Sequence, residues 1–358
     1  MQCFKSLALG FAVFVVTGLT GCLTQSQTSD ETLASWKTRP DGARDKIIQF
    51  VQKAVKCYPP EKRVAVFDMD GTLICEKPMY VESYFAVAKM AADAQMNPDL
   101  LKQPYYTEAV NINQGDFSKK TVDKFQSGIP QCWLTAFANM DETDFVKYVA
   151  DSKGIIMHPR TKQPLSQTFY KPMLEFIKYL KDNDFKVYIV SGTSTGAVRG
   201  MCKGVIKLKN SHLIGTEDML NPVYYKDKAP KLIRTSVIRM PRTLRDGKTT
   251  VILDHIGVRP ILAVGNTVDD FGMLQYTCSG STPVKPRMGM LVNHDDAVRE
   301  YVYPGYGTPM VPLKMPGDEK LTTVKADPAV ANFIKSNGWI TISVKNDFTK
   351  VFPSITVK

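Results

Sequence analysis

Residues 64–75 read VAVFDMDGTLIC, and this stretch decides the fold. Its first four residues are apolar and include two Val, a pattern typical of a short strand buried on both faces of a sheet. Asp68 and Asp70 come at the end of this run, where two carboxylates are costly unless a cation neutralises them. Gly71 and Thr72 follow at once. The stretch therefore predicts a buried strand that ends at a charged site.

Two further apolar runs end in the same way. Residues 186–190 (KVYIV) lead into Ser191-Gly192-Thr193, and residues 261–264 (ILAV) lead into Gly265-Asn266-Thr267. Helical spacing of apolar residues predicts helices between and around these strands. The predicted helices cover residues 41–55, 170–184 and 328–337, and a last strand covers residues 339–344.

Strands that alternate with helices predict an α/β fold with a doubly wound, mainly parallel sheet and helices on both faces. In such a sheet, ligands bind at the edge formed by the carboxyl ends of the strands. The polar residues after the three strands therefore lie at a predicted binding site.

The composition limits the classes of function. The chain has 358 residues, 44% of them hydrophobic, which is enough for one large or two modest domains. The formal net charge of +11 is compatible with attraction of small phosphate-bearing molecules. No motif for binding DNA or RNA is present, so we expect no nucleic-acid partner.

The N-terminus has the pattern of an export signal. An apolar run covers residues 6–18, and residues 19–22 (LTGC) resemble a bacterial lipobox, in which the Cys becomes acylated. We predict a lipoprotein signal peptide over residues 1–21, a lipid anchor at Cys22 and a linker over residues 22–40. The protein would then be periplasmic and anchored to a bacterial membrane, or secreted if the signal is an ordinary one.

Five other cysteines follow Cys22, and none is part of a CxxC pair. They are Cys57, Cys75, Cys132, Cys202 and Cys278. This spacing indicates neither a zinc site nor a dense disulfide framework. Which of them pair, if any do, stays open.

The DxDGT motif, the strand-end Ser, a downstream Lys and the GNxxxD segment together resemble the haloacid dehalogenase-like hydrolase superfamily. Segments such as FKVYIVSGT and ILAVGNT are similar to an exported, phosphoserine-phosphatase-like branch. The resemblance implies a Rossmann-like core over residues 41–74 and 169–358, the latter with a C-terminal extension. A mostly helical cap over residues 75–168 would be inserted after the first core strand.

The resemblance also implies roles for the residues at the strand ends. Asp68 would be the nucleophile that attacks phosphorus, and Asp70 the general acid and base. Gly71 and Thr72 would approach the phosphate closely. Ser191 would hold phosphate oxygens with its hydroxyl and Gly192 with its amide. Alternatively, Ser191 is only a helix cap.

A Lys is expected to screen the repulsion between Asp68 and the phosphate. Lys248 is the best candidate because it lies seventeen residues before Gly265, after an Asp-Gly pair. Its rivals are in a generally basic stretch, at Lys226, Lys228 and Lys231.

Mg²⁺ is the implied cofactor. Asp68 would supply a carboxylate and Asp70 its backbone carbonyl, and Asn266 or Asp270 would complete the protein ligands. Many superfamily members have Asp where this chain has Asn266, so the ligand set here lacks one negative charge. Motif spacing favours Asp270 over its neighbour Asp269.

Aromatic residues are frequent in the predicted cap. They could form a cage for a quaternary ammonium group, but their helical spacing favours the cap's own core. These residues are Tyr80, Tyr84, Phe85, Tyr105, Tyr106, Trp133 and Phe137. The cluster of His294 with Asp295 and Asp296 is expected to shape the site from outside its first layer of contacts.

The predicted function is a Mg²⁺-dependent phosphomonoesterase that acts on a small phosphorylated metabolite through an aspartyl phosphate. A phosphotransferase or phosphomutase is the alternative enzyme, and an inactive phosphate-binding lipoprotein is the alternative outside catalysis. The physiological substrate and the oligomeric state are not determined by these patterns.

Overall fold

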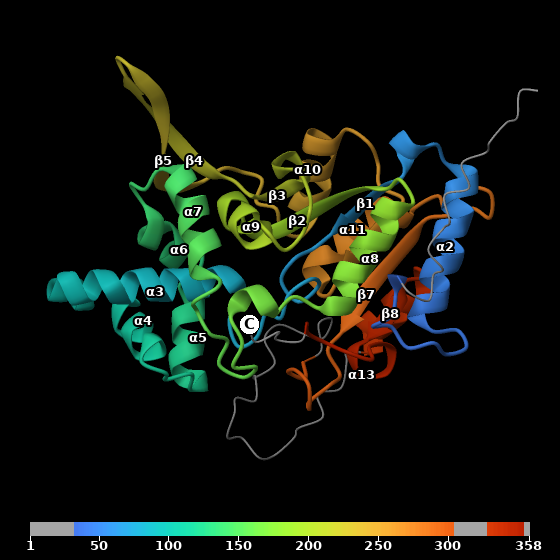
Figure 1. Ribbon diagram of the computed structural model, residues 1–358, viewed down its shortest axis with the longest axis horizontal. Helices are drawn as coiled ribbons and strands as arrows, with labels where there is room; N and C mark the ends of the chain where they lie inside the picture. The colour runs from blue at the N-terminus through green and yellow to red at the C-terminus, as the bar shows by residue number, and fades with distance from the viewer. Residues whose placement is uncertain (1–31, 304–327, 354–358) are drawn as a thin grey trace, which may run out of the picture.

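The computed structural model describes residues 32–303 and 328–353, and its centre is a six-stranded parallel sheet (Figure 1). The strand order is β3-β2-β1-β6-β7-β8. The strands are β1 (Val64–Phe67), β2 (Lys186–Ser194), β3 (Leu213–Thr216), β6 (Leu262–Gly265), β7 (Met288–Asn293) and β8 (Ile340–Ser343). The predicted α/β class is confirmed, and β2 runs four residues further than its apolar core.

Helices cover both faces of this sheet, as a doubly wound fold requires. Phe67 of β1 packs edge-on against Phe176, with ring centroids 5.5 Å apart. Val66, between Ala65 and Phe67, belongs to the core of the opposite face. The first face is covered by α2 (Ala43–Cys57) and α8 (Lys171–Asp182), and the second by α10 (Asp246–Ile256), α11 (Phe271–Cys278) and α12 (Pro328–Ser336).

Five helices lie between β1 and α8 in the chain and stand to one side of the sheet (Figure 1). They are α3 (Val81–Met96), α4 (Tyr106–Asn113), α5 (Lys119–Ser127), α6 (Gln131–Phe137) and α7 (Glu142–Ser152). We call this group the helical insert. Short 3₁₀ turns are found at Pro60–Lys62, Pro98–Lys102, Leu165–Gln167, Asn210–His212 and Val268–Asp270.

The helical insert is joined to the sheet through α7 and α9 (Thr195–Cys202), the helix that follows β2. A Cβ added at Gly196 would lie 2.7 Å from the ring of Phe145, and one at Gly200 would lie 2.6 Å from Val149. Lys153, just after α7, donates to the carbonyl of Gly200 at 2.9 Å. Two glycines one turn apart thus let α7 approach α9 closely.

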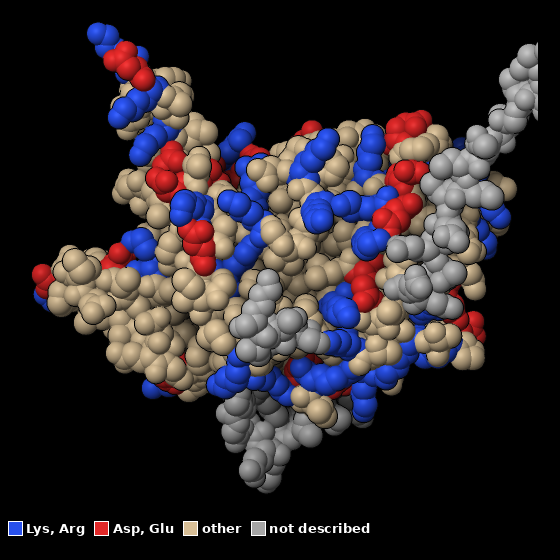
Figure 2. All heavy atoms as spheres, in the orientation of Figure 1, with Lys and Arg blue, Asp and Glu red and all other residues tan. Residues whose placement is uncertain are grey.

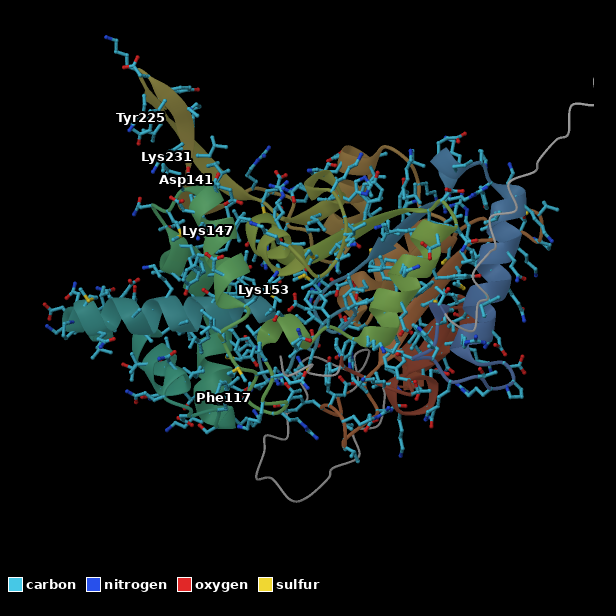
Figure 3. The ribbon with its side chains drawn as sticks, viewed as in Figure 1. Phe117, Asp141, Lys147, Lys153, Tyr225 and Lys231 are labelled. Atoms are coloured by element: carbon cyan, nitrogen blue, oxygen red, sulfur yellow. The ribbon has the colours of Figure 1, made fainter. Side chains whose placement is uncertain are left out.

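An antiparallel hairpin that was not predicted projects from the molecule (Figures 1 and 2). Its strands are β4 (Asp218–Tyr225) and β5 (Lys228–Ile238). The residue just before α7 pairs with the middle of β5, where Asp141 accepts a hydrogen bond from the amide of Leu232 at 3.0 Å. Tyr225 and Lys231 lie further out along the hairpin (Figure 3). Its exposed residues lack the continuous apolar run by which the sheet strands were recognised.

The predicted linker ends earlier than expected. Residues 22–31 and the predicted signal peptide lie outside the described residues, but residues 32–36 are packed against the body of the protein. Leu33 and Trp36 are buried, and Trp36 Nε1 donates to the carbonyl of Pro172 at 2.9 Å. Trp36 also packs edge-on against Phe348, with ring centroids 5.0 Å apart. Such contacts with distant segments leave no local pattern in the sequence.

The ends of the chain's C-terminal elements agree with the prediction within a few residues. The strand expected over residues 339–344 is β8, and a short helix, α13 (Val344–Asp347), follows it.

Cys57, Cys75, Cys132, Cys202 and Cys278 are all free thiols. Within residues 32–303 and 328–353, no helix has the length and apolar character needed to cross a bilayer.

Candidate active site

The sheet order places the three polar strand ends side by side. β1 lies between β2 and β6, and the amide of Asp68 donates to the carbonyl of Val264 at 2.9 Å. A cavity of about 190 Å³ opens at this edge. Five acidic residues line it, namely Asp68, Asp70, Glu76, Asp269 and Asp270. Lys248 and Arg242 are the basic residues on its wall.

Lys248 lies between two of these carboxylates. Its Nζ is 2.5 Å from Asp68 Oδ1 and 2.6 Å from Asp270 Oδ1. Lys248 belongs to the first turn of α10. The side chain is buried, and these two acids are its ion-pair partners among the residues that the structure describes.

The electrostatics of this group favour a charged lysine. Burial lowers the pKa of Lys248, but the carboxylates of Asp270 and Asp68 outweigh burial and hold the pKa above its ordinary value. Burial raises the pKa of Asp68, and the Lys248 ammonium opposes that rise. The contact between Lys248 and Asp68 is therefore what favours an ionised carboxylate, the form that a nucleophile needs.

Two hydrogen-bond donors hold the carboxylate of Asp70. The amide of Val81, at the start of α3, donates to Asp70 Oδ1 at 2.8 Å, and the hydroxyl of Thr193 donates to Oδ2 at 2.7 Å. Burial raises the pKa of Asp70 to about 6. A carboxyl group with a pKa near the working pH is suited to give and take protons. Thr193 was not singled out in the sequence, although it directly follows Ser191-Gly192.

Gly71 and Thr72 lie close to the side chain of Asn266. Gly71 has φ +74°, and a Cβ there would lie 1.8 Å from Asn266 Nδ2, so only glycine fits this contact. The Thr72 hydroxyl lies 3.3 Å from Asp68 Oδ2 and 3.5 Å from Asn266 Oδ1. The two oxygens thus face the same hydroxyl.

Glu76 is a site residue that the sequence did not reveal. Its Oε1 accepts a hydrogen bond from Asn266 Nδ2 at 3.3 Å. Because a carboxylate only accepts, this contact turns the amide oxygen of Asn266 toward Thr72 and Asp68. Nothing in the local sequence distinguishes Glu76 from a solvated acid after a turn.

Ser191 and Gly192 lie at the predicted edge. Ser191 is fully buried, and its Oγ accepts from the amide of Thr193 at 3.2 Å. A Cβ at Gly192 would lie 3.2 Å from Leu244, so the backbone there is closely covered. Both residues line the cavity, in addition to Thr193.

The structure separates the alternative candidates. Asp270 is buried and accepts from the amides of Asn266 at 2.8 Å and Thr267 at 3.0 Å, whereas Asp269 pairs with the exposed Arg245. Both acids line the cavity, and the functional role of Asp270 stays a prediction. The three rival lysines, Lys226, Lys228 and Lys231, are exposed on or next to the projecting hairpin.

Two of the seven aromatic residues line the cavity. Tyr80 and Trp133 do so, with ring centroids 6.4 Å apart. The others do not line it, and Tyr84, Phe85, Tyr106 and Phe137 are buried in the core. His294 is also buried, and its Nδ1 lies 2.8 Å from Glu300 Oε1. It does not line the cavity.

The oxygen atoms of this site suit a hard cation. Among residues 32–303 and 328–353, no three His, Cys, Asp or Glu side chains are grouped as a metal site. The ligands that the resemblance implies for a cation are Asp68, the carbonyl of Asp70 and either Asn266 or Asp270, and all four residues line the cavity. Mg²⁺ accepts such mixed oxygen ligands and keeps several waters.

Comparison with known proteins agrees with the fold. Residues 62–220 match the haloacid dehalogenase-like hydrolase family. The matched range includes Asp68, Asp70 and Ser191 but ends before Lys248 and Asn266. No curated protein matches the chain.

Several solved structures are similar to this chain at low sequence identity. A protein of unknown function from Bordetella pertussis Tohama I is 13% identical, with 78% of this chain and 98% of that chain covered and a TM-score of 0.43. A functionally unknown protein from Anaerococcus prevotii DSM 20548 is 16% identical, with 71% and 86% covered and a TM-score of 0.48. A phosphoserine phosphohydrolase-like protein from Francisella tularensis subsp. tularensis SCHU S4 is 14% identical, with 64% and 87% covered and a TM-score of 0.32.

Proposed function

We propose that this chain is a Mg²⁺-dependent phosphomonoesterase that acts on a small phosphorylated metabolite through an aspartyl phosphate. The observation that carries the proposal is the contact of Lys248 with both Asp68 and Asp270 at the wall of the cavity at the sheet edge. The match of residues 62–220 to a hydrolase family supports it independently.

In the proposed reaction, a carboxylate oxygen of Asp68 attacks phosphorus and the bond from phosphorus to the ester oxygen breaks. Asp70 gives its proton to the leaving alkoxide, which departs as the alcohol. Asp70 then takes a proton from water as the water oxygen attacks the phosphoryl group. The bond from phosphorus to Asp68 breaks, so phosphate leaves and both acids return to their starting states.

The neighbouring residues position these groups. Lys248 lowers the repulsion between Asp68 and the dianionic substrate, and the buried hydroxyl of Ser191 and the backbone of Gly192 face the transferred group. A bound Mg²⁺ would neutralise charge on the phosphoryl oxygens. Thr193 keeps Asp70 turned away from Lys248, so that Asp70 is free to exchange a proton.

The test is phosphate release from 4-nitrophenyl phosphate, with and without Mg²⁺. We expect Asp68→Asn to lower kcat/KM by at least about 10³-fold, because no carboxylate remains to attack phosphorus. Asp269→Asn is the matched control, since Asp269 lines the same cavity but pairs with the exposed Arg245, and its loss should be under about tenfold. Activity that persists in Asp68→Asn would rule out the proposed nucleophile.

Two further measurements distinguish this proposal from the alternative functions. Transfer of the phosphoryl group to an added alcohol, faster than its release to water, would indicate a phosphotransferase. Binding of a phosphate compound without turnover in the wild type would indicate an inactive binding protein. Asn266, which lacks the charge of an acid, is the feature that favours this last alternative.

We also propose that the protein is exported and anchored by lipid at Cys22, on the basis of the lipobox-like residues 19–22. In a bacterial host, labelled palmitate should be incorporated by the wild type and not by Cys22→Ala. Incorporation into both proteins would show that Cys22 is not the acylated residue.

A further inference from the structure

Arg242 is a basic residue on the cavity wall whose guanidinium has no partner among the residues that the structure describes. Its Nε is buried and makes no hydrogen bond. The other basic residue on this wall, Lys248, is bonded to Asp68 and Asp270. A buried donor without an acceptor is costly, and a guanidinium is best satisfied by a carboxylate or a phosphate. The arrangement therefore favours an anion that arrives with the ligand.

The backbone that carries Arg242 is fixed in place. Thr243 is buried, and its hydroxyl donates to the carbonyl of Gly215 at 2.8 Å. Its amide donates to Thr216 Oγ1 at 3.3 Å, and the Thr216 hydroxyl donates to the carbonyl of Gly192 at 2.9 Å. This chain of bonds holds Arg242 next to the carboxyl end of β2, so little ordering is needed when a ligand binds.

Arg242 lies on the side of the main cavity that adjoins the helical insert. Arg242 and Trp133 line both the main cavity and a smaller hollow beside it. The hollow is also lined by Glu82 of the helical insert and by Arg234 of the hairpin, but not by Asp68. A phosphoryl group on Asp68 would therefore direct the rest of the substrate toward Trp133 and Arg242.

We propose that Arg242 binds a second negative charge, carried by the leaving group of the substrate. The substrate class is then a small phosphomonoester whose alcohol part bears a carboxylate or a second phosphate. The cavity of about 190 Å³ is below the ~300 Å³ at which pockets for drug-sized ligands begin, which agrees with a small molecule. This inference rests on the proposed phosphatase activity, because the direction of the leaving group is set by attack from Asp68.

The test uses three phosphomonoesters whose alcohol parts share a two-carbon skeleton. Ethyl phosphate has a neutral leaving group, 2-phosphoglycolate carries a carboxylate, and ethane-1,2-diyl bisphosphate carries a second phosphate. In the wild type we expect kcat/KM for at least one of the charged esters to exceed that for ethyl phosphate by about 10- to 100-fold, as for a hydrogen bond between charged groups. Which charged ester is preferred identifies the anion.

In Arg242→Gln this ratio should fall to about 1, and in Arg242→Lys it should be intermediate, because a lysine keeps the charge and loses the planar donors. Arg239→Gln is the matched control. Arg239 pairs with Glu217 on the surface outside the main cavity, so the ratio should stay as in the wild type. A ratio near 1 in the wild type, or equal losses on all three esters in Arg242→Gln, would overturn the proposal.

Failure of the inference is separable from failure of the phosphatase proposal. If the wild type hydrolyses ethyl phosphate or 4-nitrophenyl phosphate without preference for charged esters, only the role of Arg242 is wrong. If it hydrolyses none of them, calorimetric binding of the same three esters still measures the preference. Equal affinities of the wild type and Arg242→Gln for 2-phosphoglycolate and for the bisphosphate would then contradict the proposal.

Discussion

Asp68, Lys248 and Asp270 illustrate how single residues determine this site. A buried lysine without an acid, or two buried acids without a cation, would lower the free energy of unfolding. Together, the ammonium and the two carboxylates compensate each other's charge. Lys248 is thus expected to contribute to stability and to the chemistry. The contribution to stability is measured by removing the charge of Lys248 and determining the free energy of unfolding.

Lys248→Met should lower the free energy of unfolding by about 3 kcal/mol at pH 7, because two buried carboxylates lose the ammonium that pairs with both of them. The loss should be smaller at pH 5, where protonation removes the unpaired negative charges. Urea unfolding at the two pH values measures this. Lys231→Met, at an exposed hairpin position, should change stability by less than about 0.5 kcal/mol and leave phosphate release intact. A loss for Lys248→Met that does not depend on pH would contradict the explanation.

Gly71→Ala should lower phosphate release without unfolding the protein. The added Cβ would lie 1.8 Å from Asn266 Nδ2 and 2.9 Å from Glu76 Cδ, at a residue with φ +74°. Asn266 must then move away from Thr72, and the oxygen atoms at the strand ends no longer converge. Phosphate release is measured beside a thermal melt, and full activity in a folded Gly71→Ala protein would show that the Asn266 contact is dispensable.

Among the elements, the crossing of α7 and α9 joins the helical insert to the sheet. The crossing depends on the absence of side chains at Gly196 and Gly200, and Lys153 supports it by capping carbonyls at the end of α9. Lys147 belongs to α7 and pairs with Asp151 on the surface, whereas Lys153 directly follows the helix and is buried against α9 (Figure 3). Close packing of this kind tolerates little added volume.

Gly200→Ala should therefore destabilise the protein by about 1–3 kcal/mol, even though alanine favours a helix more than glycine does. The new Cβ would lie 2.6 Å from Val149 Cβ and 2.9 Å from the carbonyl oxygen of Val146. Gly154→Ala is the control, since its nearest atom would be 3.9 Å away, and its effect should be within about 0.5 kcal/mol. Equal stabilities of the two variants in urea would refute the proposed close crossing.

In the whole molecule, Glu82 links the helical insert to the end of β2. Its two oxygens accept from the amide of Ser194 at 2.8 Å and from the Ser194 hydroxyl at 2.6 Å, and the side chain is fully buried. Burial raises the pKa of Glu82 to about 7. The hydrogen bonds from Ser194 and the nearby charge of Arg234 act in the opposite direction and lower this pKa. Asp218, which also faces Glu82, adds to the rise.

This raised pKa predicts a pH dependence of stability. An acid whose pKa is higher in the folded than in the unfolded state stabilises the fold at low pH, and the contribution is lost as pH rises toward 7. Between pH 5 and pH 8, the wild type should lose about 2 kcal/mol more stability than Glu82→Gln. Urea unfolding of both proteins at both pH values checks this, because other titrating groups contribute equally to each. A difference that stays constant with pH would contradict it.

The α/β architecture could be predicted from local patterns in the sequence. Buried parallel strands are short, apolar and followed by polar residues, and these properties belong to neighbours in the chain. Because parallel strands all end at one edge, the placement of Asp68, Ser191 and Asn266 together followed from the fold class without any knowledge of contacts. Lys248 and Asp270 were found by motif spacing alone.

The remaining features depend on contacts between segments far apart in the chain, which no local pattern records. Glu76 acquires its role from Asn266, and Trp36 its burial from Pro172 and Phe348. Arg242 looks like any surface arginine until the sheet edge and the helical insert enclose it. Local periodicity thus determined the layers of this protein, and the short motifs at the strand ends determined the candidate acids, whereas the tertiary structure alone decided which other side chains reach them.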